Sequence, residues 1–237
     1  MSVANRVVVI TGATGGLGRV VARRLAEEGA RLALFSTNTT HLDALAAELQ
    51  LPAERLLVRA VDLRDAGAAR EAAQAVIAKF GRAEILLHLV GGWAGGTPVV
   101  AVEAGTVDEM LQQHLWTTLY LMQAFVPLFL TNGWGRLIAV SSPFASHPQA
   151  KGAPYAIGKA AQEALFQTLA AELADTGVTA NLLLVRTIDA QHERDRERTA
   201  KNSAWTSPEE ICAAILYLCS QEASAVNGAR LPLYGRP

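Results

Sequence analysis

Short apolar runs recur along the whole chain and are the clearest pattern in the sequence. They occupy residues 7–10, 32–35, 56–58, 85–87, 137–140, 182–185 and 231–233. The first six are continuous rather than alternating with polar residues, which is typical of β-strands covered on both faces. The pattern therefore predicts a sheet buried between two other layers.

Segments rich in Ala, Glu and Leu separate these runs and have helical periodicity, at residues 19–28, 41–50, 66–80 and 160–175. Alternation of strand and helix implies right-handed crossovers. It predicts an α/β fold with a parallel, doubly wound sheet and helices on both faces. Because no repeat, low-complexity tract or linker interrupts the pattern, we expect residues 1–237 to form one domain.

Residues 189–205 break this alternation and carry a dense run of charges from His192 to Arg198. Such a run is typical of a solvated, salt-bridged helix or loop. A long irregular insertion in a compact α/β domain is also often a lid over a binding site. The two interpretations are compatible, and we expect a short substrate lid here.

Composition narrows the classes of function. Of the 237 residues, 51% are hydrophobic and 18% are charged, which excludes overall disorder. The formal net charge of −1 gives no reason to expect nucleic acid or an anionic membrane as a partner. No apolar run reaches the roughly 18–20 residues that span a bilayer. Since the first residues lack a signal-peptide pattern, we expect a cytoplasmic protein. We expect its partner to be a small molecule.

The two cysteines, Cys212 and Cys219, lie in a segment with helical character near the C-terminus. Seven helical residues separate them by roughly 10 Å of rise, too far for a disulfide. Because the sequence contains no Cys-x-x-Cys or Cys/His cluster, we expect two core thiols and no metal site.

A glycine-rich turn follows the first apolar run and precedes the first helix. It reads Thr11-Gly12-Ala13-Thr14-Gly15-Gly16-Leu17-Gly18. The glycines at 12, 16 and 18 permit a tight turn in which backbone N–H groups approach a pyrophosphate, and the positive end of the helix adds attraction. A glycine-rich turn alone is a weak signal. Its place between the first strand and the first helix predicts a dinucleotide-binding loop.

This TGxxxGxG spacing resembles the dinucleotide loop of short-chain dehydrogenases/reductases, and the resemblance covers almost the whole chain. It implies a Rossmann-type fold with a mostly parallel, seven-stranded sheet. Asp62, followed by Leu63, matches the family aspartate that hydrogen-bonds the adenine amino group. Relatives are commonly dimers or tetramers, which implies a homo-oligomer built on the helices at residues 103–131 and 154–176. In the loop itself, the resemblance assigns cofactor binding to Gly12, Thr14, Gly15, Gly16, Leu17 and Gly18.

The end of the second strand bears on which dinucleotide is bound. Family members that use NAD usually place a carboxylate there, which binds the ribose hydroxyls and repels a 2′-phosphate. Here the position is Ser36, followed by Thr37 and Asn38, whose hydroxyl and amide groups suit a phosphate. The arginines that NADP-using relatives often carry correspond to Gly15 and Thr37. We therefore expect NADP(H) to be favoured, with NAD(H) as the alternative.

The sequence Tyr155-Ala156-Ile157-Gly158-Lys159 fits the YxxxK motif of this family, thirteen residues after Ser142. On a helix, positions i and i+4 lie on one face, so the phenol and the ammonium can share a site. An unperturbed phenol has a pKa near 10, and a nearby cation lowers it. The resemblance implies that Tyr155 is the general acid or base. Lys159 would tune it and hold the nicotinamide ribose, and Ser142 would hydrogen-bond the reacting carbonyl.

Several positions depart from the family pattern. His114 stands where relatives have a fourth catalytic residue, an asparagine that supports a relay water. It either still holds water or is a packed helix residue. Where relatives read NNAG at the end of the fourth strand, this chain reads His88-Leu89-Val90-Gly91, followed by Gly92. The resemblance makes Val90, Gly91 and Gly92 candidate cofactor-binding residues. Ile188 matches the position whose backbone meets the nicotinamide carboxamide. Arg186 is unusual there. We expect it to pair with Asp189 or with acidic lid residues, and the alternative is that it recognises an anionic group.

The glycine-rich loop around Trp93 and the region 189–205 look similar to dihydropteridine reductases, a branch of the same superfamily that typically lacks the catalytic serine. Trp93 either stacks on a flat substrate or is a core or interface residue. By position alone, Phe144 and His147 are further candidates for lining the substrate pocket.

Three hypotheses for function follow. The leading one is an NAD(P)(H)-dependent oxidoreductase of a carbonyl/alcohol pair, such as a 3-oxoacyl compound or another ketone. The second is a reductase of a pteridine-like ring or a quinone. The third is a non-catalytic NAD(P)-binding sensor, against which the joint presence of Ser142, Tyr155 and Lys159 argues.

Overall fold

A computed structural model describes residues 3–234 of the chain. The strands are β1 (Val7–Thr11), β2 (Arg31–Ser36), β3 (Leu56–Ala60), β4 (Ile85–His88), β5 (Gly135–Ser141), β6 (Val178–Leu184) and β7 (Arg230–Pro232). The helices are α1 (Gly16–Glu27), α2 (Thr39–Leu49), α3 (Ala66–Phe80), α4 (Ala104–Leu111), α5 (Thr117–Asn132), α6 (Ala153–Glu172), α7 (Glu193–Arg196) and α8 (Pro208–Leu218).

The seven strands form one parallel sheet in the order β3-β2-β1-β4-β5-β6-β7. This confirms the predicted doubly wound, Rossmann-type architecture. Successive residues of a strand point to opposite faces. In β1, Val7 and Val9 therefore enter one hydrophobic core, whereas Val8 and Ile10 enter the other. Burial on both faces explains why the strands are continuous apolar runs in the sequence.

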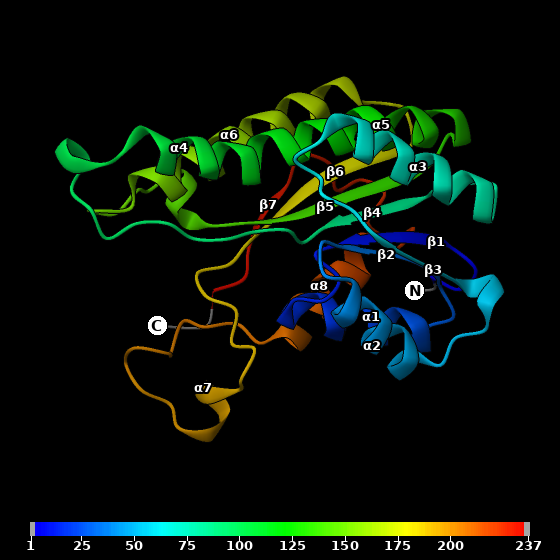
Figure 1. The fold of residues 1–237 in the computed structure, drawn as a ribbon, viewed down its shortest axis with the longest axis horizontal. Helices are drawn as coiled ribbons and strands as arrows, with labels where there is room; N and C mark the ends of the chain where they lie inside the picture. The colour runs from blue at the N-terminus through cyan, green and yellow to red at the C-terminus, as the bar shows by residue number, and fades with distance from the viewer. Residues whose placement is uncertain (1–2, 235–237) are drawn as a thin grey trace.

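Helices cover the two faces in two layers. Helices α3, α5 and α6 pack on one face, and α1, α2 and α8 pack on the other (Figure 1). Cys212 and Cys219 belong to the second core as free, buried thiols, as expected. Burial raises the pKa of Cys212 to about 11 and that of Cys219 to about 12, so both thiols stay protonated at neutral pH.

The strand order reverses between β1 and β4. The chain runs outward from β1 through β2 to β3 and then returns to place β4 on the other side of β1. Thr11 is in register with Phe35 of β2 and His88 of β4, so the three strands end at the same edge. In open parallel sheets, ligands bind outside the carboxyl ends of the strands where the order reverses. The glycine-rich turn after β1 lies at that point.

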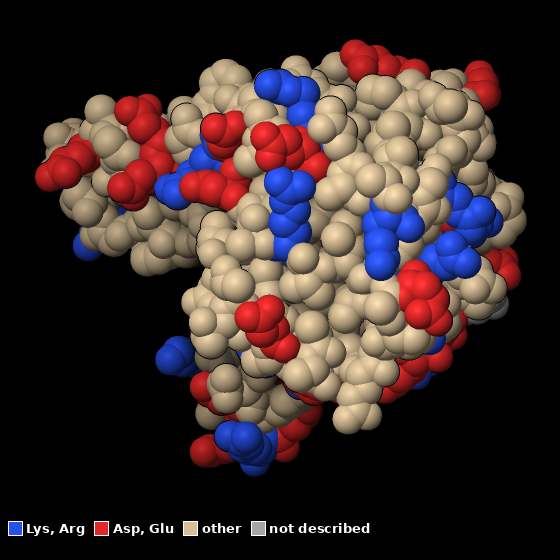
Figure 2. Space-filling view, turned by 45° about the vertical axis from the view of Figure 1, so that its right-hand side comes forward, with Lys and Arg blue, Asp and Glu red and all other residues tan. Residues whose placement is uncertain are grey.

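Two segments differ from the expected pattern. The predicted helix at 103–131 is divided into α4 and α5 by a π-helical turn, Gln112–Trp116. The segment 189–205 holds the one-turn helix α7 and projects from the body of the fold (Figure 1). Within residues 3–234, no helix is long and apolar enough to cross a membrane, and no group of His, Cys, Asp and Glu could hold a metal. On the face drawn in Figure 2, acidic and basic side chains lie interspersed.

Candidate active site

The glycine-rich turn between β1 and α1 is built for close backbone approach. A Cβ on Gly18 would come within 2.3 Å of the Gly12 carbonyl oxygen, and Gly12 itself has a φ of +70°, which favours glycine. Gly15 caps α1 without a side-chain hydrogen bond. The N–H groups of the first helical turn, at Gly16, Leu17 and Gly18, have no intrahelical acceptor. This end of α1 therefore suits a phosphate.

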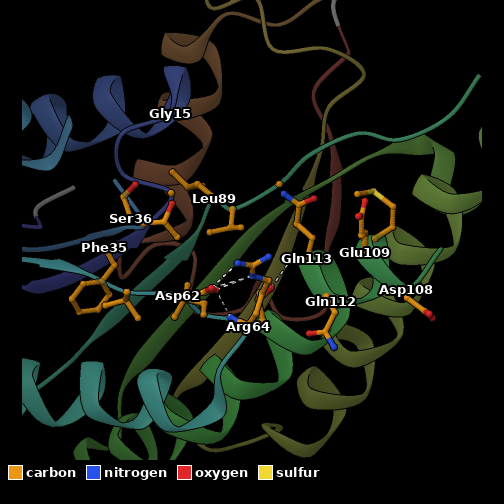
Figure 3. Close-up of a pocket in the computed structure, with 18 of the residues that line it drawn as sticks. Gly15, Phe35, Ser36, Asp62, Arg64, Leu89, Asp108, Glu109, Gln112 and Gln113 are labelled. Atoms are coloured by element: carbon orange, nitrogen blue, oxygen red, sulfur yellow. Dashed lines mark hydrogen bonds and ion pairs between the residues drawn. The ribbon is translucent and has the colours of Figure 1, made fainter. Parts of the chain in front are cut away.

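A cavity of about 860 Å³ opens at the carboxyl edge of the sheet, beside this turn (Figure 3). The loops after β1, β2, β3 and β4 form one wall, and α4 with the π turn forms the other. Of the predicted cofactor residues, the cavity is lined by Gly12, Gly15, Ser36, Thr37, Asp62, Leu63, Val90 and Gly91. The other wall carries Asp108, Glu109, Gln112 and Gln113.

Asp62 lies in this wall, but its carboxylate is engaged by a neighbour that the sequence did not single out. The Arg64 guanidinium donates to both carboxylate oxygens, with Nη2 2.6 Å from Oδ2 (Figure 3). The Arg64 side chain holds the pKa of Asp62 below its usual value, because hydrogen bonding to the charged form favours it. Asp62 is therefore a carboxylate at neutral pH and can accept from an amino group.

At the end of β2, the Ser36 hydroxyl lies 2.7 Å from the Thr14 hydroxyl, which joins this end of the cavity to the glycine-rich turn. Thr37 lines the cavity beside it. The side-chain oxygen of Asn38 accepts from the His41 N–H and caps α2. The N-terminus of α2 therefore begins beside Ser36 and Thr37.

The YxxxK residues and Ser142 converge at the ends of β5 and α6. Lys159 is buried, and its ammonium donates to the Val140 carbonyl at 2.8 Å. Ser142 is buried as well and interacts with the Tyr155 phenol. The ring of Phe144 meets the Tyr155 ring edge to face, with centroids 6.2 Å apart. The structure thus brings the predicted catalytic side chains into one site.

The expected lowering of the Tyr155 pKa by Lys159 is wrong for this structure. Burial of the phenol raises the pKa of Tyr155, and the hydrogen bond with Ser142 opposes that rise only in part. Burial lowers the pKa of Lys159 to about 7, against the favourable charge of Glu163. Desolvation disfavours the charged form of each group, which keeps the phenol a proton donor at neutral pH.

His114 lies next to both Tyr155 and Gly91, a residue that lines the cavity. It lies in the π turn, a feature that is frequent at functional sites. Its Nε2 is 3.2 Å from the Gly92 carbonyl, so Nε2 carries the proton and Nδ1 is left as an acceptor with no partner among the described residues. Its ring lies edge to face on Tyr155 at 5.6 Å. Burial, and then the charge of Lys159, lower the pKa of His114 to about 3, so it is neutral.

His88 is a second buried histidine, at the end of β4. Its Nδ1 lies 2.8 Å from the Thr11 hydroxyl and its Nε2 lies 3.3 Å from the Thr117 hydroxyl. Thr117 donates its own proton to the Gln113 carbonyl, so His88 Nε2 donates and Nδ1 accepts. Burial lowers the pKa of His88 to about 3. It ties β1 and β4 to the start of α5 as a neutral ring.

Three further residues predicted from the sequence are Trp93, His147 and Ile188. Trp93 is 63% exposed and lies outside the cavity, and its ring covers Gly95. His147 is exposed and lies 3.0 Å from the Ser146 hydroxyl. Ile188 forms a bridge with Thr206, and the chain beyond it reaches the phosphate-binding turn at Gly16.

The expected pairing of Arg186 is wrong. Its guanidinium lies over the Tyr234 ring, 5.2 Å from the centroid. The Asp189 carboxylate instead accepts from the backbone N–H groups of Glu193 and Arg194. A buried carboxylate at the start of a helical turn satisfies N–H groups that have no other acceptor, and this explains the preference.

Sequence reasoning missed a group of polar residues behind the motif, namely Thr118, Gln162 and Glu163. All three are buried. Gln162 and Glu163 come three and four residues after Lys159, on the same helix face. Polar residues at that spacing in an otherwise apolar helix were the signal that could have found them.

Comparison with known proteins agrees with this geometry. A family model described as short chain dehydrogenase matches residues 6–201. The chain is 30% identical to a 1,6-dihydroxycyclohexa-2,4-diene-1-carboxylate dehydrogenase of Pseudomonas putida, over 97% of this chain and 91% of that one. It is also 30% identical to a D-threitol dehydrogenase of Mycolicibacterium smegmatis, covering 97% and 92%. The solved structure of levodione reductase has the same fold, with a TM-score of 0.88 at 24% identity, covering 98% and 97%.

The chain therefore belongs to the short-chain dehydrogenase/reductase family and is an oxidoreductase. Proteins of this family bind nicotinamide cofactors, and the residues present fit such a group. The backbone cradle at Gly12 and Gly18 would be filled by any Cβ, and the cavity continues from it along the ends of β2 and β3.

Proposed function

We propose that the enzyme transfers hydride between a nicotinamide cofactor and a carbonyl/alcohol pair. The observation that carries the proposal is the convergence of Ser142, Tyr155 and Lys159 at the end of β5, joined through His114 to the cofactor cavity. The names of the two relatives above denote dehydrogenases of hydroxylated compounds, which supports this substrate class.

Each side chain has a role that follows from its surroundings. Tyr155 gives a proton to the carbonyl oxygen during reduction, since its raised pKa keeps the phenol protonated. Ser142 donates to the same oxygen and stabilises its developing charge. Lys159 binds the ribose of the cofactor with the N–H group that its protein partners leave free. When bound, the nicotinamide supplies or accepts the hydride. His114 holds the Gly92 turn against the Tyr155 ring as a neutral side chain.

A substrate panel tests this proposal. The purified enzyme with NADPH or NADH is offered ketones, 3-oxoacyl thioesters, quinones and a quinonoid dihydropterin, and cofactor oxidation is measured. We expect turnover with a ketone or a 3-oxoacyl thioester. Turnover confined to the dihydropterin or to quinones would reassign the substrate class. Tight cofactor binding with no turnover across the panel would point to a sensor instead.

For the cofactor, we propose that NADP(H) is preferred over NAD(H). β2 ends in a hydroxyl, Ser36, where a carboxylate would repel a 2′-phosphate, and Thr37 adds a second hydroxyl. The N-terminus of α2 lies beside both, and its partial positive charge attracts an anion. Arg19, whose Nε donates to the Thr14 carbonyl at 3.2 Å, brings a cation to the same side.

A cofactor titration checks this preference. We expect NADPH to bind more tightly than NADH to the unmodified enzyme. Ser36→Asp places a carboxylate at the end of β2 and should weaken NADPH by roughly 10-fold or more, because like charges at close range disfavour each other by more than about 1.4 kcal/mol. NADH affinity in the same variant is the internal control and should hold or improve. Tighter NADH binding by the unmodified enzyme would reverse the assignment.

We also propose a cytoplasmic location, a single domain, a lid at residues 189–205 and self-association. Support for the lid is that α7 projects from the fold while Asp189 anchors its start next to the phosphate-binding turn. Support for a homodimer or homotetramer is exposed apolar surface on the helices, at Trp116, Leu130 and Ile157.

A further inference from the structure

Behind the proposed catalytic residues, a buried side-chain amide joins α6 to α5. Gln162 has no exposed surface. Its Oε1 accepts from the Lys159 ammonium at 3.0 Å, and its Nε2 donates to the Thr118 hydroxyl at 3.1 Å. Thr118 in turn donates to the backbone carbonyl of His114 at 2.6 Å. A continuous chain of hydrogen bonds thus runs from the ammonium to the π turn.

The donor and acceptor roles along this series of hydrogen bonds are fixed by the groups at its two ends. An ammonium only donates, so the Gln162 oxygen must face Lys159. A carbonyl only accepts, so Thr118 must give its proton to His114 and is left to accept from the amide. Each group has one orientation that satisfies it. A buried polar network in which every member is satisfied fixes the conformation of its members.

We propose that Gln162 is a positioning residue that holds the Lys159 ammonium in place for the cofactor ribose, with Thr118 as its anchor on the π turn. The proposal rests on the proposed function, because it presumes that Lys159 binds the ribose. Of the three N–H groups of Lys159, the Val140 carbonyl and Gln162 accept one each. The third is left for the ribose, and its direction follows from the other two.

The titratable groups that face Lys159 are distinct from Gln162 and Thr118. On its own helix it is faced by Tyr155 and by Glu163, whose carboxylate accepts from Ser141 and from Arg230 of β7 at 2.7 Å each. From β4 and the π turn it is faced by His88 and His114, both neutral at neutral pH. Glu163 therefore supplies the opposite charge near Lys159, whereas Gln162 is uncharged and supplies an oriented hydrogen-bond acceptor to the ammonium.

Two variants and two matched controls test whether Gln162 and Thr118 hold Lys159 in position. Gln162→Met removes the amide with an unbranched side chain, and Thr118→Val removes the hydroxyl with a side chain of the same shape. Gln167→Met is the control on the same helix, where an exposed amide donates to the Gly228 carbonyl. Thr131→Val is the control on α5, where an exposed hydroxyl donates to the Pro127 carbonyl. Thr118→Ser restores the hydroxyl.

We expect Gln162→Met both to slow hydride transfer and to weaken NADPH binding. The product of the two effects should be roughly 10- to 100-fold, since a hydrogen bond to a charged group contributes about 1.5–3 kcal/mol. Thr118→Val should act in the same direction and less than additively with Gln162→Met, since both break one chain. The two controls should stay within about twofold of the unmodified enzyme, and Thr118→Ser should recover most of the loss.

The titration of Lys159 gives a readout that a purely structural role would not move. The chain has four lysines, and Lys79, Lys151 and Lys201 are exposed. In NMR of enzyme labelled with ¹³C at lysine Cε, Lys159 should titrate with a pKa of about 7. Gln162→Glu places a carboxylate against the ammonium and should raise the pKa of Lys159. Gln162→Met should lower it.

The outcomes separate this inference from the proposed function. If Tyr155→Phe abolishes turnover while Gln162→Met behaves like Gln167→Met in rate, affinity and titration, the positioning role is overturned and the function stands. If Tyr155→Phe retains turnover, the function itself is overturned. Should Gln162→Met fail to fold, Thr118→Val and Gln162→Glu decide. An unchanged rate with an unchanged Lys159 titration in both would overturn the role of Gln162.

Discussion

Replacing Tyr155 by phenylalanine should reduce hydride transfer by roughly 100- to 10,000-fold, the range that general acid–base catalysis contributes. The variant removes one oxygen atom and keeps the ring. That ring is held edge to face between His114 and Phe144, with centroids at 5.6 and 6.2 Å, so the phenylalanine should lie in the same place. What is lost is the proton of the phenol, together with its interaction with Ser142.

The measurement is single-turnover oxidation of NADPH with the best substrate from the panel, alongside a fluorescence titration of NADPH binding. Cofactor affinity should change by less than about threefold, because the phenol is proposed to act on the substrate oxygen. Tyr217→Phe is a matched control, since Tyr217 is 41% exposed on α8. Turnover of the Tyr155 variant at the rate of the Tyr217 variant would remove Tyr155 from the proposed mechanism.

Substituting Gly18 by alanine should abolish most cofactor binding. The added Cβ would lie 2.3 Å from the Gly12 carbonyl oxygen and 2.7 Å from that of Ala13. Both atoms belong to the backbone of the turn, so relief of the clash must move the turn itself. Overpacking of this kind costs typically about 1–3 kcal/mol of stability. Loss of two backbone hydrogen bonds to a charged phosphate would weaken binding by roughly 100-fold or more.

NADPH titration measures the affinity, and urea denaturation measures the free energy of unfolding. Gly105→Ala is the control. Gly105 lies in the first turn of α4, on the opposite wall of the same cavity, and a Cβ there meets no atom within 4 Å, so the added methyl group displaces no backbone. Alanine there should leave binding within about twofold and should slightly favour the helix, since glycine is the poorer helix former by about 0.5–1 kcal/mol. Equal NADPH affinity of the Gly18 and Gly105 variants would contradict the assignment of this turn to the phosphate.

The residues in both predictions, Tyr155 and Gly18, stand out in the sequence alone, because each belongs to a motif whose members lie close together in the chain. A glycine-rich turn between a strand and a helix, or a tyrosine and a lysine four residues apart on one helix, is a short-range pattern that the sequence displays directly. The continuous apolar runs are equally local, and they predicted the two-sided burial of β1, β2, β4 and β6.

Long-range contacts were not visible in this way. Arg186 was expected to pair with an acidic residue close to it in the chain, whereas the structure places its guanidinium over the ring of Tyr234, far along the chain. The direction of the Tyr155 pKa shift was also wrong. Burial of the phenol depends on Phe144, His114 and the rest of the fold, whereas the helix spacing shows only that Lys159 is near.

The sequence by itself determined the parallel α/β architecture, and it singled out the glycine-rich turn after β1 and the residues Ser142, Tyr155 and Lys159 as candidates for the site. Each follows from periodicity or from a motif whose members lie close in the chain. Only the tertiary structure decided that Gln162 and Thr118 support Lys159, because residues on α5 and α6 meet only after the helices have packed on the sheet. The protonation of the buried groups was likewise decided by packing, since desolvation is a property of the assembled core.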